Sequence, residues 1–352
     1  MTKTRIACAV TGLVCLVAAA LLAWLITPDW VARAPGGRVD HRSYEGTFQT
    51  LLDPAALAQG NLLGAVKSQV PMSVEQTVKV EKTSGDKALI SDTRTTSAAG
   101  NKVEQTRWEY AVDRYSLEAV GSHPADWNVV AAQGLTVSWP LGAEKKTYQG
   151  WTPETRTTTP LTYLRSEKKQ GISTYVYEAK VAPTKIVDDQ ILSTLPKTLP
   201  RNVLKLVGLS GSVPAAQAAQ LAQLLPQLPD PVPLAYAFQD DSTFWIDPST
   251  GLVIDVQRAQ QRVAEIALPG GPAVPLLPAV VASYHATAAS SAKAADDARH
   301  DRAVIRWAGV YLPIILLVLG AVLLALAVAL SVMMRGRRPR SVAAEEVPPG
   351  SS

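Results

Sequence analysis

Two long runs without charge, one near each end of the chain, constrain this sequence more than any other feature. Residues Ile6–Ile26 contain no charged side chain over 21 positions, and Trp307–Met334 contain none over 28. At ~1.5 Å per residue the first run forms a helix about 31 Å long, which matches the hydrocarbon thickness of a bilayer. The second run is longer and is expected to tilt or to project outward. The sequence therefore predicts a membrane protein with two spanning helices.

Flanking charges and aromatic residues orient both helices, because cytoplasmic flanks contain an excess of Lys and Arg. The basic flanks lie toward the chain ends: Lys3, Arg5, Arg335, Arg337, Arg338 and Arg340. Aromatic residues typical of the membrane interface lie at the opposite helix ends: Trp24, Trp30, Trp307 and Tyr311. We therefore expect a two-pass protein of the cell membrane, with tails 1–5 and 335–352 in the cytoplasm and residues 27–306 exported.

The alternative for the first run, 6–26, is a cleaved signal peptide. Ala32-Arg33-Ala34 resembles a cleavage site, but it lies late and Pro35 follows it. The run also exceeds a usual signal-peptide core, so retention as a membrane helix is expected. Both cysteines, Cys8 and Cys15, lie in this run and are interpreted as apolar filler. The exported domain has no cysteine and must fold without disulfides.

The net charge of +4 comes from the tails. Lys3 and Arg5 precede the first run, and four arginines follow the second against Glu345 and Glu346. Subtracting both tails from 34 basic and 30 acidic residues leaves 28 of each sign in the rest of the chain. The exported domain is therefore neutral, which gives no reason to expect nucleic acid as a partner.

The exported domain shows strand patterns early in the chain. Val74, Val78 and Val80 alternate with polar residues, and turns at 84–86 and 99–101 separate this strand from two more. In the third, Trp108 and Tyr110 share one face, so the pattern predicts an antiparallel meander. Further strands are expected at 135–139, 156–165, 172–181 and 234–238, and 244–256 is expected to form a hairpin with a five-residue loop at 247–251. Residues 27–60 mix Pro, Gly and charge and predict only a short helix around 54–58.

Helical patterns occupy two later segments. An insertion at about 191–228 contains leucines at helical spacing, namely Leu221, Leu224, Leu225 and Leu228. Residues 283–306 are rich in Ala and predict a helix continuous with the second membrane span. The expected fold class is α+β: an antiparallel β-rich exported domain with a helical insertion, flanked by two transmembrane helices.

Known catalytic and metal-binding motifs are absent from the sequence. None of the four histidines has a second His or a Cys at ligand spacing. The segment 208–212 resembles a nucleophile elbow, but Ser212 replaces its last glycine, so a helix break is the interpretation. The acidic pairs Asp188-Asp189 and Asp240-Asp241 are interpreted as solvated loop acids. We expect no enzyme activity, no catalytic or metal-binding residue and no cofactor.

Two segments and the two-span layout give this chain a family resemblance. WPLGAEKKTYQGW at 139–151 and FWIDPSTGLVIDV at 244–256, together with the two spans, resemble an actinobacterial family of envelope proteins labelled the porin PorA family. The resemblance covers essentially the whole chain and implies no catalytic residues. The architecture is also similar to class B scavenger receptors, which have two terminal spans and a β-rich ectodomain and move lipids through an internal tunnel. That similarity is of architecture alone.

These observations lead to one functional expectation and two alternatives. We expect a non-enzymatic envelope protein whose exported domain binds an apolar ligand, an envelope lipid, and aids its transport. Leu221, Leu224, Leu225 and Leu228 are the candidate ligand-binding residues. The first alternative is an assembly scaffold, since Ala321, Ala325 and Ala329 form a small-residue face for the first span, a second copy or an envelope partner. The second is a porin-like permeability component, as the family label implies.

Overall fold

The computed structural model describes residues 2–24, 35–58, 61–209, 214–266 and 273–335. The chain forms two compact units, one made of residues 1–32 and 303–352 and the other of residues 33–302. The predictions for Trp30, Arg337, Arg338 and Arg340 lie outside the described residues.

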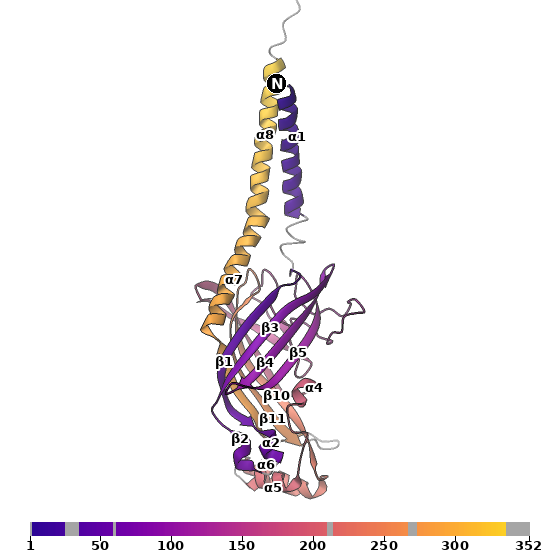
Figure 1. Ribbon diagram of the computed structural model, residues 1–352, viewed down its shortest axis with the longest axis vertical. Coiled ribbons are helices and arrows are strands. Elements are labelled where there is room, and N and C mark those ends of the chain that lie inside the picture. The colour runs from indigo at the N-terminus through magenta and orange to yellow at the C-terminus, as the bar shows by residue number, and fades with distance from the viewer. Residues whose placement is uncertain (1, 25–34, 59–60, 210–213, 267–272, 336–352) are drawn as a thin grey trace, which may run out of the picture. The chain divides into compact units, whose positions relative to one another are not determined.

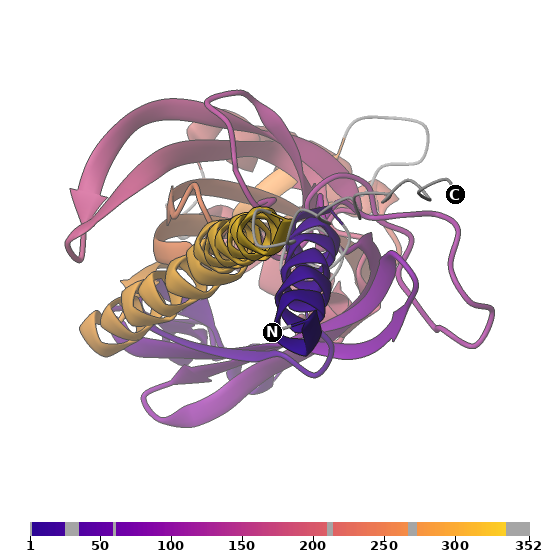
Figure 2. The same cartoon turned by 90° about the horizontal axis from the view of Figure 1, so that it is seen from above.

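The first unit contains two apolar helices that pack side by side in opposite directions, α1 (Thr2–Leu21) and α8 (Leu312–Arg335) (Figures 1 and 2). Both lie in helices long and apolar enough to cross a membrane, Lys3–Trp24 and Ala288–Met333, whose 18-residue apolar windows have mean hydropathies of 2.6 and 3.0. Because the helices are antiparallel, Lys3 and Arg5 lie at the same end of the pair as Arg335.

The interface aromatics lie at the other end of this helix pair. Trp24 is 84% exposed, and Trp307 and Tyr311 form an edge-on ring pair with centroids 5.4 Å apart. These last two residues bound a π-helical turn, η3 (Trp307–Tyr311), that joins α8 to α7 (Ala288–Arg306). The helix is therefore continuous into the second apolar run, as predicted. Its beginning differs, because Ser283–Ala286 belongs to a strand and not to the predicted helix.

The second unit is one antiparallel sheet that curves into a half-barrel (Figure 2). Its main strands follow the order β5-β4-β3-β1-β12-β11-β10-β8-β7-β6. Their bounds are β1 (Val39–Leu52), β3 (Val70–Ser84), β4 (Lys87–Ala98), β5 (Asn101–Asp113), β6 (Tyr148–Thr152), β7 (Thr157–Lys169), β8 (Ile172–Lys185), β10 (Val232–Ile246), β11 (Val253–Ile266) and β12 (Val274–Ala286). Two short strands, β2 (Val66–Lys67) and β9 (Thr198–Leu199), pair with β1 and β10. The predicted α+β class with an antiparallel sheet is confirmed.

The first and last strands of the sheet, β1 and β12, are neighbours in its middle. Tyr44 is opposite Ala286, and the pairing runs to Leu51 opposite Val280. The chain thus enters and leaves the sheet on adjacent strands. Neither strand was predicted from the sequence. In β1, charged residues and Gly46 interrupt the apolar alternation, and Gly46 is required because a Cβ there would lie 2.1 Å from the Ser283 carbonyl oxygen of β12.

The two edge strands of the sheet are β5 and β6. The chain segment between them, residues 114–147, forms isolated bridges to both edges. Leu135 bridges both to Glu118 and to Gly150 of β6, and Val112 of β5 bridges to Ala119. The strand predicted at 135–139 is therefore wrong, because only Leu135 pairs. From Trp139 onward this segment instead hydrogen-bonds to the loop of the β10–β11 hairpin.

The two segments of the family resemblance hydrogen-bond to each other at this hairpin. The Trp139 amide donates to the Gly251 carbonyl at 3.2 Å, and the Ala143 amide donates to the Pro248 carbonyl at 2.8 Å. Gly251 has a φ of +71°, and a Cβ there would lie 2.0 Å from the Trp139 carbonyl oxygen. Only glycine fits this position. The predicted hairpin is confirmed, and its loop is one residue longer than predicted, at 247–252 between β10 and β11.

Short helices cover one part of the sheet interior. They are α2 (Pro54–Ala58), α3 (Leu62–Ala65), α4 (Asp189–Leu192), α5 (Arg201–Leu209), α6 (Ala215–Leu224) and the 3₁₀ turn η2 (Leu225–Gln227). The main hydrophobic core lies between α4–α6 and the inner sheet face, where Trp108, Tyr110 and Phe238 are fully buried. Arg107 and Glu109, on the opposite face of β5, are exposed or half-buried, as the alternation predicted.

Candidate ligand cavity and buried charge network

Of the four leucines predicted to bind a ligand, Leu221 and Leu224 lie on α6, Leu225 lies on η2, and Leu228 follows η2 directly. Leu221 is 1% exposed and Leu225 is buried, and both pack in the main core against residues such as Leu204. Leu228 packs against the same core from a half-buried position, and Leu224 is half-buried. None of the four lines the cavity inside the half-barrel.

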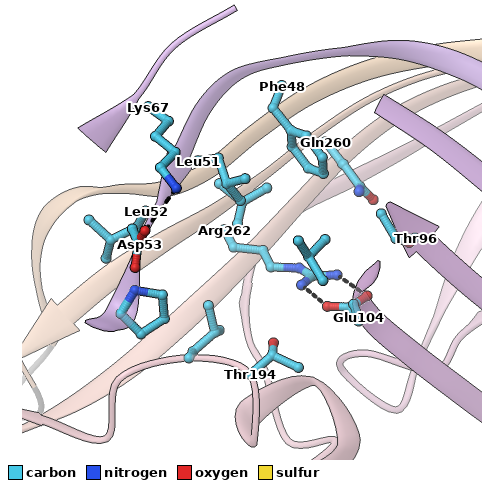
Figure 3. Close-up of a pocket in the computed structure, with 14 residues that line it drawn as sticks. Phe48, Leu51, Leu52, Asp53, Lys67, Thr96, Glu104, Thr194, Gln260 and Arg262 are labelled. Carbon is cyan, nitrogen blue, oxygen red and sulfur yellow. Dashed lines mark hydrogen bonds and ion pairs between the residues drawn. The ribbon is translucent and has the colours of Figure 1, made fainter. Parts of the chain in front are cut away.

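A cavity of about 320 Å³ lies inside the half-barrel, beside the carboxyl end of β1 (Figure 3). Its wall comes from β1, β4, β5, β11 and β12 and from the segment after α4. The lining residues are Phe48, Leu51, Leu52, Asp53, Pro54, Lys67, Thr96, Val103, Glu104, Thr194, Leu195, Gln260, Arg262 and Val280. The volume is at the lower end of the range for small-molecule sites, about 300–1,000 Å³.

The lining divides into an apolar wall and a polar end. Phe48, Leu52, Leu195 and Val280 are buried and present hydrocarbon to the cavity. At the polar end, β11 contributes Gln260 and Arg262 from alternate positions on the same strand face, and Thr96 and Glu104 face them from β4 and β5 (Figure 3). Such an arrangement can hold a molecule that has both a hydrocarbon part and a polar group.

The four ionisable residues of the cavity are held in two ion pairs. Lys67 Nζ lies 2.8 Å from Asp53 Oδ2. Arg262 donates to both carboxylate oxygens of Glu104, with 3.0 Å between Nη2 and Oε1. Arg262 is 6% exposed; burial lowers its pKa, but Glu104 outweighs this and leaves the pKa raised. The Arg262 guanidinium therefore stays charged inside the half-barrel.

Further charged groups line the inner sheet face next to the cavity. The Tyr44 hydroxyl donates to Gln76, Gln76 donates to Asp92, and Arg94 pairs with Asp92, each at 2.8 Å. A second cluster lies on β10 and β11, where Arg258 donates to Asp240 at 2.9 Å and to Ser242 at 2.8 Å. Buried charge on this scale is costly unless it is paired, and here most of it is.

Glu154 lies close enough to this network to act on three of its cations. The residue is 5% exposed, and its charge raises the pKa of Arg94, Arg258 and Arg262, although burial opposes it. Its backbone carbonyl accepts from Val187. The inner face thus combines an apolar core with a connected polar zone.

This polar zone was not predicted from the sequence, and two acids lie in other environments than predicted. Asp240 is 2% exposed in the middle of β10, and Asp188 is 4% exposed where it caps α4 and accepts from Trp108 Nε1 at 3.0 Å. Interpreting them as solvated loop acids was wrong, although their neighbours Asp189 and Asp241 are exposed. One signal was available: Asp240 alternates with buried apolar positions, so it shares their face.

The contact between the two apolar helices uses glycine and not the predicted alanine face. A Cβ on Gly320 would lie 2.9 Å from the Gly12 carbonyl oxygen, and one on Gly12 would lie 3.0 Å from that of Gly320. Ala327 is buried on the same side. Ala321, Ala325 and Ala329 are exposed in the helix unit, so the prediction that they pack against the first span is wrong.

The fold and the helix pair define a class: a membrane protein with a curved antiparallel β-domain between two apolar helices. The chain belongs to the Porin PorA family, whose model matches residues 6–329. This confirms the family resemblance drawn from the sequence. A search of curated proteins finds no match.

Proposed function

We propose that this protein is a non-enzymatic envelope membrane protein whose β-domain binds the hydrocarbon part of a lipid. The observation that supports this most directly is the cavity inside the half-barrel, with Phe48, Leu51 and Leu195 in its apolar wall. Burial of hydrocarbon stabilises a complex by about 25 cal/mol per Å² of apolar surface removed from water. A single alkyl chain is suited to this space, whereas a large polar solute is not.

Two further features favour this role. Both ends of the β-domain lead into apolar helices, so the domain is tethered to the bilayer that supplies lipid. The four ionisable cavity residues, among them Asp53 and Glu104, are in ion pairs, whereas a general acid or base must be free to exchange a proton. The cytoplasmic placement of both tails, 1–5 and 335–352, belongs to the same proposal.

Photo-crosslinking of the full chain in nanodiscs tests the lipid site. A lipid with a diazirine at its chain end is expected to label Phe48–Asp53 in addition to the membrane helices. Leu51→Trp fills the cavity and is expected to abolish the first label. Leu206→Trp is the matched control, because Leu206 is 50% exposed on α5 and does not line the cavity. Labelling confined to α1 and α8 would contradict lipid binding.

Porin-like permeability is the second candidate, and the buried charge network favours it together with the family. Pores are lined by polar and charged groups, and Arg94, Arg258 and Asp240 form such a lining inside the sheet. The measurement is conductance of the purified full chain in planar lipid bilayers. A pore through the half-barrel predicts that Arg258→Gln shifts the anion-to-cation permeability ratio. Absence of conductance at any protein density would remove this candidate.

A further inference from the structure

Gln260 is a buried polar side chain whose amide faces the cavity without a partner. It is 8% exposed in the middle of β11, and within the described part of the chain its amide has no hydrogen bond. Figure 3 shows the amide directed toward Thr96, whose hydroxyl likewise has no partner among the described residues. Amides in protein interiors are normally hydrogen-bonded, so this one, which reaches the cavity surface, points to a ligand group or water that completes it.

Arg262 adds one more unsatisfied donor at the same end of the cavity. Its two Nη atoms donate to Glu104, but its Nε is buried and has no acceptor among the described residues. Gln260 and Thr96 therefore offer donors and acceptors to the cavity, and Arg262, paired with Glu104, adds no unpaired charge. A group that both donates and accepts, such as a hydroxyl, matches this set.

An anionic head group does not match it. The one cation at this end, Arg262, is already neutralised by Glu104. A carboxylate or phosphate would lie beside the Glu104 carboxylate, or would displace it from Arg262 and leave it buried without a cation. Either arrangement is unfavourable, so the electrostatics select against an anionic ligand.

We infer that the cavity recognises a single-chain lipid with an uncharged, hydroxyl-bearing head group. The hydroxyl lies between Gln260 and Thr96, and the chain lies along Phe48, Leu51 and Leu195. The volume of about 320 Å³ accommodates one chain and not the several chains of a typical bilayer lipid. This inference rests on the proposed lipid-binding function and specifies its ligand class.

A matched pair of probes tests the head-group preference in the full chain in nanodiscs. Decanol and decanoate, each with a diazirine at the chain end remote from the head group, differ only in that group. The pH is held well above the carboxyl pKa so that decanoate is charged. Labelling of 48–54 is divided by labelling of α8, which corrects for unequal partition into the bilayer. We expect this ratio to be at least about fivefold higher for decanol, the effect of one hydrogen bond.

Variants and a probe without a head group complete the experiment. Gln260→Leu is expected to lower the decanol ratio about fivefold, and Thr96→Val to lower it less. A diazirine-bearing decane reports whether the cavity persists, and its ratio is expected to be equal in wild type and variants. Equal decanol and decanoate ratios, or an unchanged decanol ratio in Gln260→Leu, would overturn the head-group inference alone. No cavity labelling by any of the three probes would overturn the lipid-binding function itself.

Discussion

Arg302 donates through Nε to both carboxylate oxygens of Asp247, at 3.0 Å to Oδ1 and 2.9 Å to Oδ2. Asp247 is fully buried and opens the hairpin loop between β10 and β11, where the Thr250 hydroxyl also donates to it at 2.7 Å. Arg302 lies on α7, whose Ala294 and Ala298 pack against the same hairpin region. This ion pair therefore joins the most characteristic hairpin of the sequence to the helix that continues into the second membrane span.

Removal of Arg302 is expected to destabilise the protein strongly. Arg302→Met leaves the Asp247 carboxylate buried without its cation, which costs about 3–5 kcal/mol of unfolding free energy. Thermal and denaturant unfolding of the full chain in detergent measures the loss. Lys293→Met on the same helix is the control, because its pair with Asp297 is 58% and 31% exposed and contributes about 0.5 kcal/mol or less. Equal effects of the two substitutions would refute this role of the buried pair.

The glycine contact between α1 and α8 predicts that a large side chain at Gly320 lowers the stability of the helix pair, whereas one at Ala325 does not. Gly320→Leu forces the helices apart, because even a Cβ would lie 2.9 Å from the Gly12 carbonyl oxygen. We expect a loss of about 1–3 kcal/mol or more, measured as thermal stability in micelles. Ala325→Leu is the matched control on the exposed face and is expected to leave the pair intact. If Ala325→Leu instead dissociates an oligomer without lowering monomer stability, the scaffold alternative gains support.

Tyr44 predicts a pH dependence at alkaline pH. Burial raises the pKa of Tyr44 to about 12, and its hydroxyl donates to Gln76. The unfolded pKa is about 10, so the folded state favours the neutral phenol. Its contribution to stability is complete below about pH 10 and is lost as the pH rises through about 12.

Circular dichroism melts between about pH 10 and 12, followed together with tyrosinate absorbance, check this contribution. Tyr44→Phe is expected to flatten the fall in melting temperature over that window and to cost about 1 kcal/mol at neutral pH. An identical pH profile in the variant would show that Tyr44 does not titrate as described.

The positive-inside pattern predicts the topology. A phosphatase active only outside the cytoplasm is fused after Gly100 in one chain and after Ser352 in another. We expect activity in the first and none in the second, because flanks rich in Lys and Arg, here Lys3, Arg5 and the arginines from Arg335 onward, favour the cytoplasmic side. Activity only in the second fusion would show the opposite topology, with residues 27–306 in the cytoplasm. Activity in both fusions would place the carboxyl tail outside the cytoplasm.

Local pattern was enough for several parts of this protein. The two apolar helices follow from run length alone, since a bilayer demands about 20 apolar residues whatever the rest of the chain does. The hairpins at Gly85 and Gly251 follow from turn chemistry, and both residues have positive φ. The faces of β5 follow from alternation, with Trp108 inside and Arg107 outside.

Long-range pairing decided what local pattern left open. The sequence by itself determined the membrane helices, the meander and its turns, because these depend on neighbours a few positions apart. Only the tertiary structure placed β1 beside β12, paired Asp240 with Arg258, and brought Gln260 and Arg262 to face Thr96 and Glu104 around a cavity. Whether a charged side chain in a strand can be buried depends on whether the fold brings an oppositely charged partner to it. For Glu104 that partner is Arg262, which is 158 positions away in the sequence.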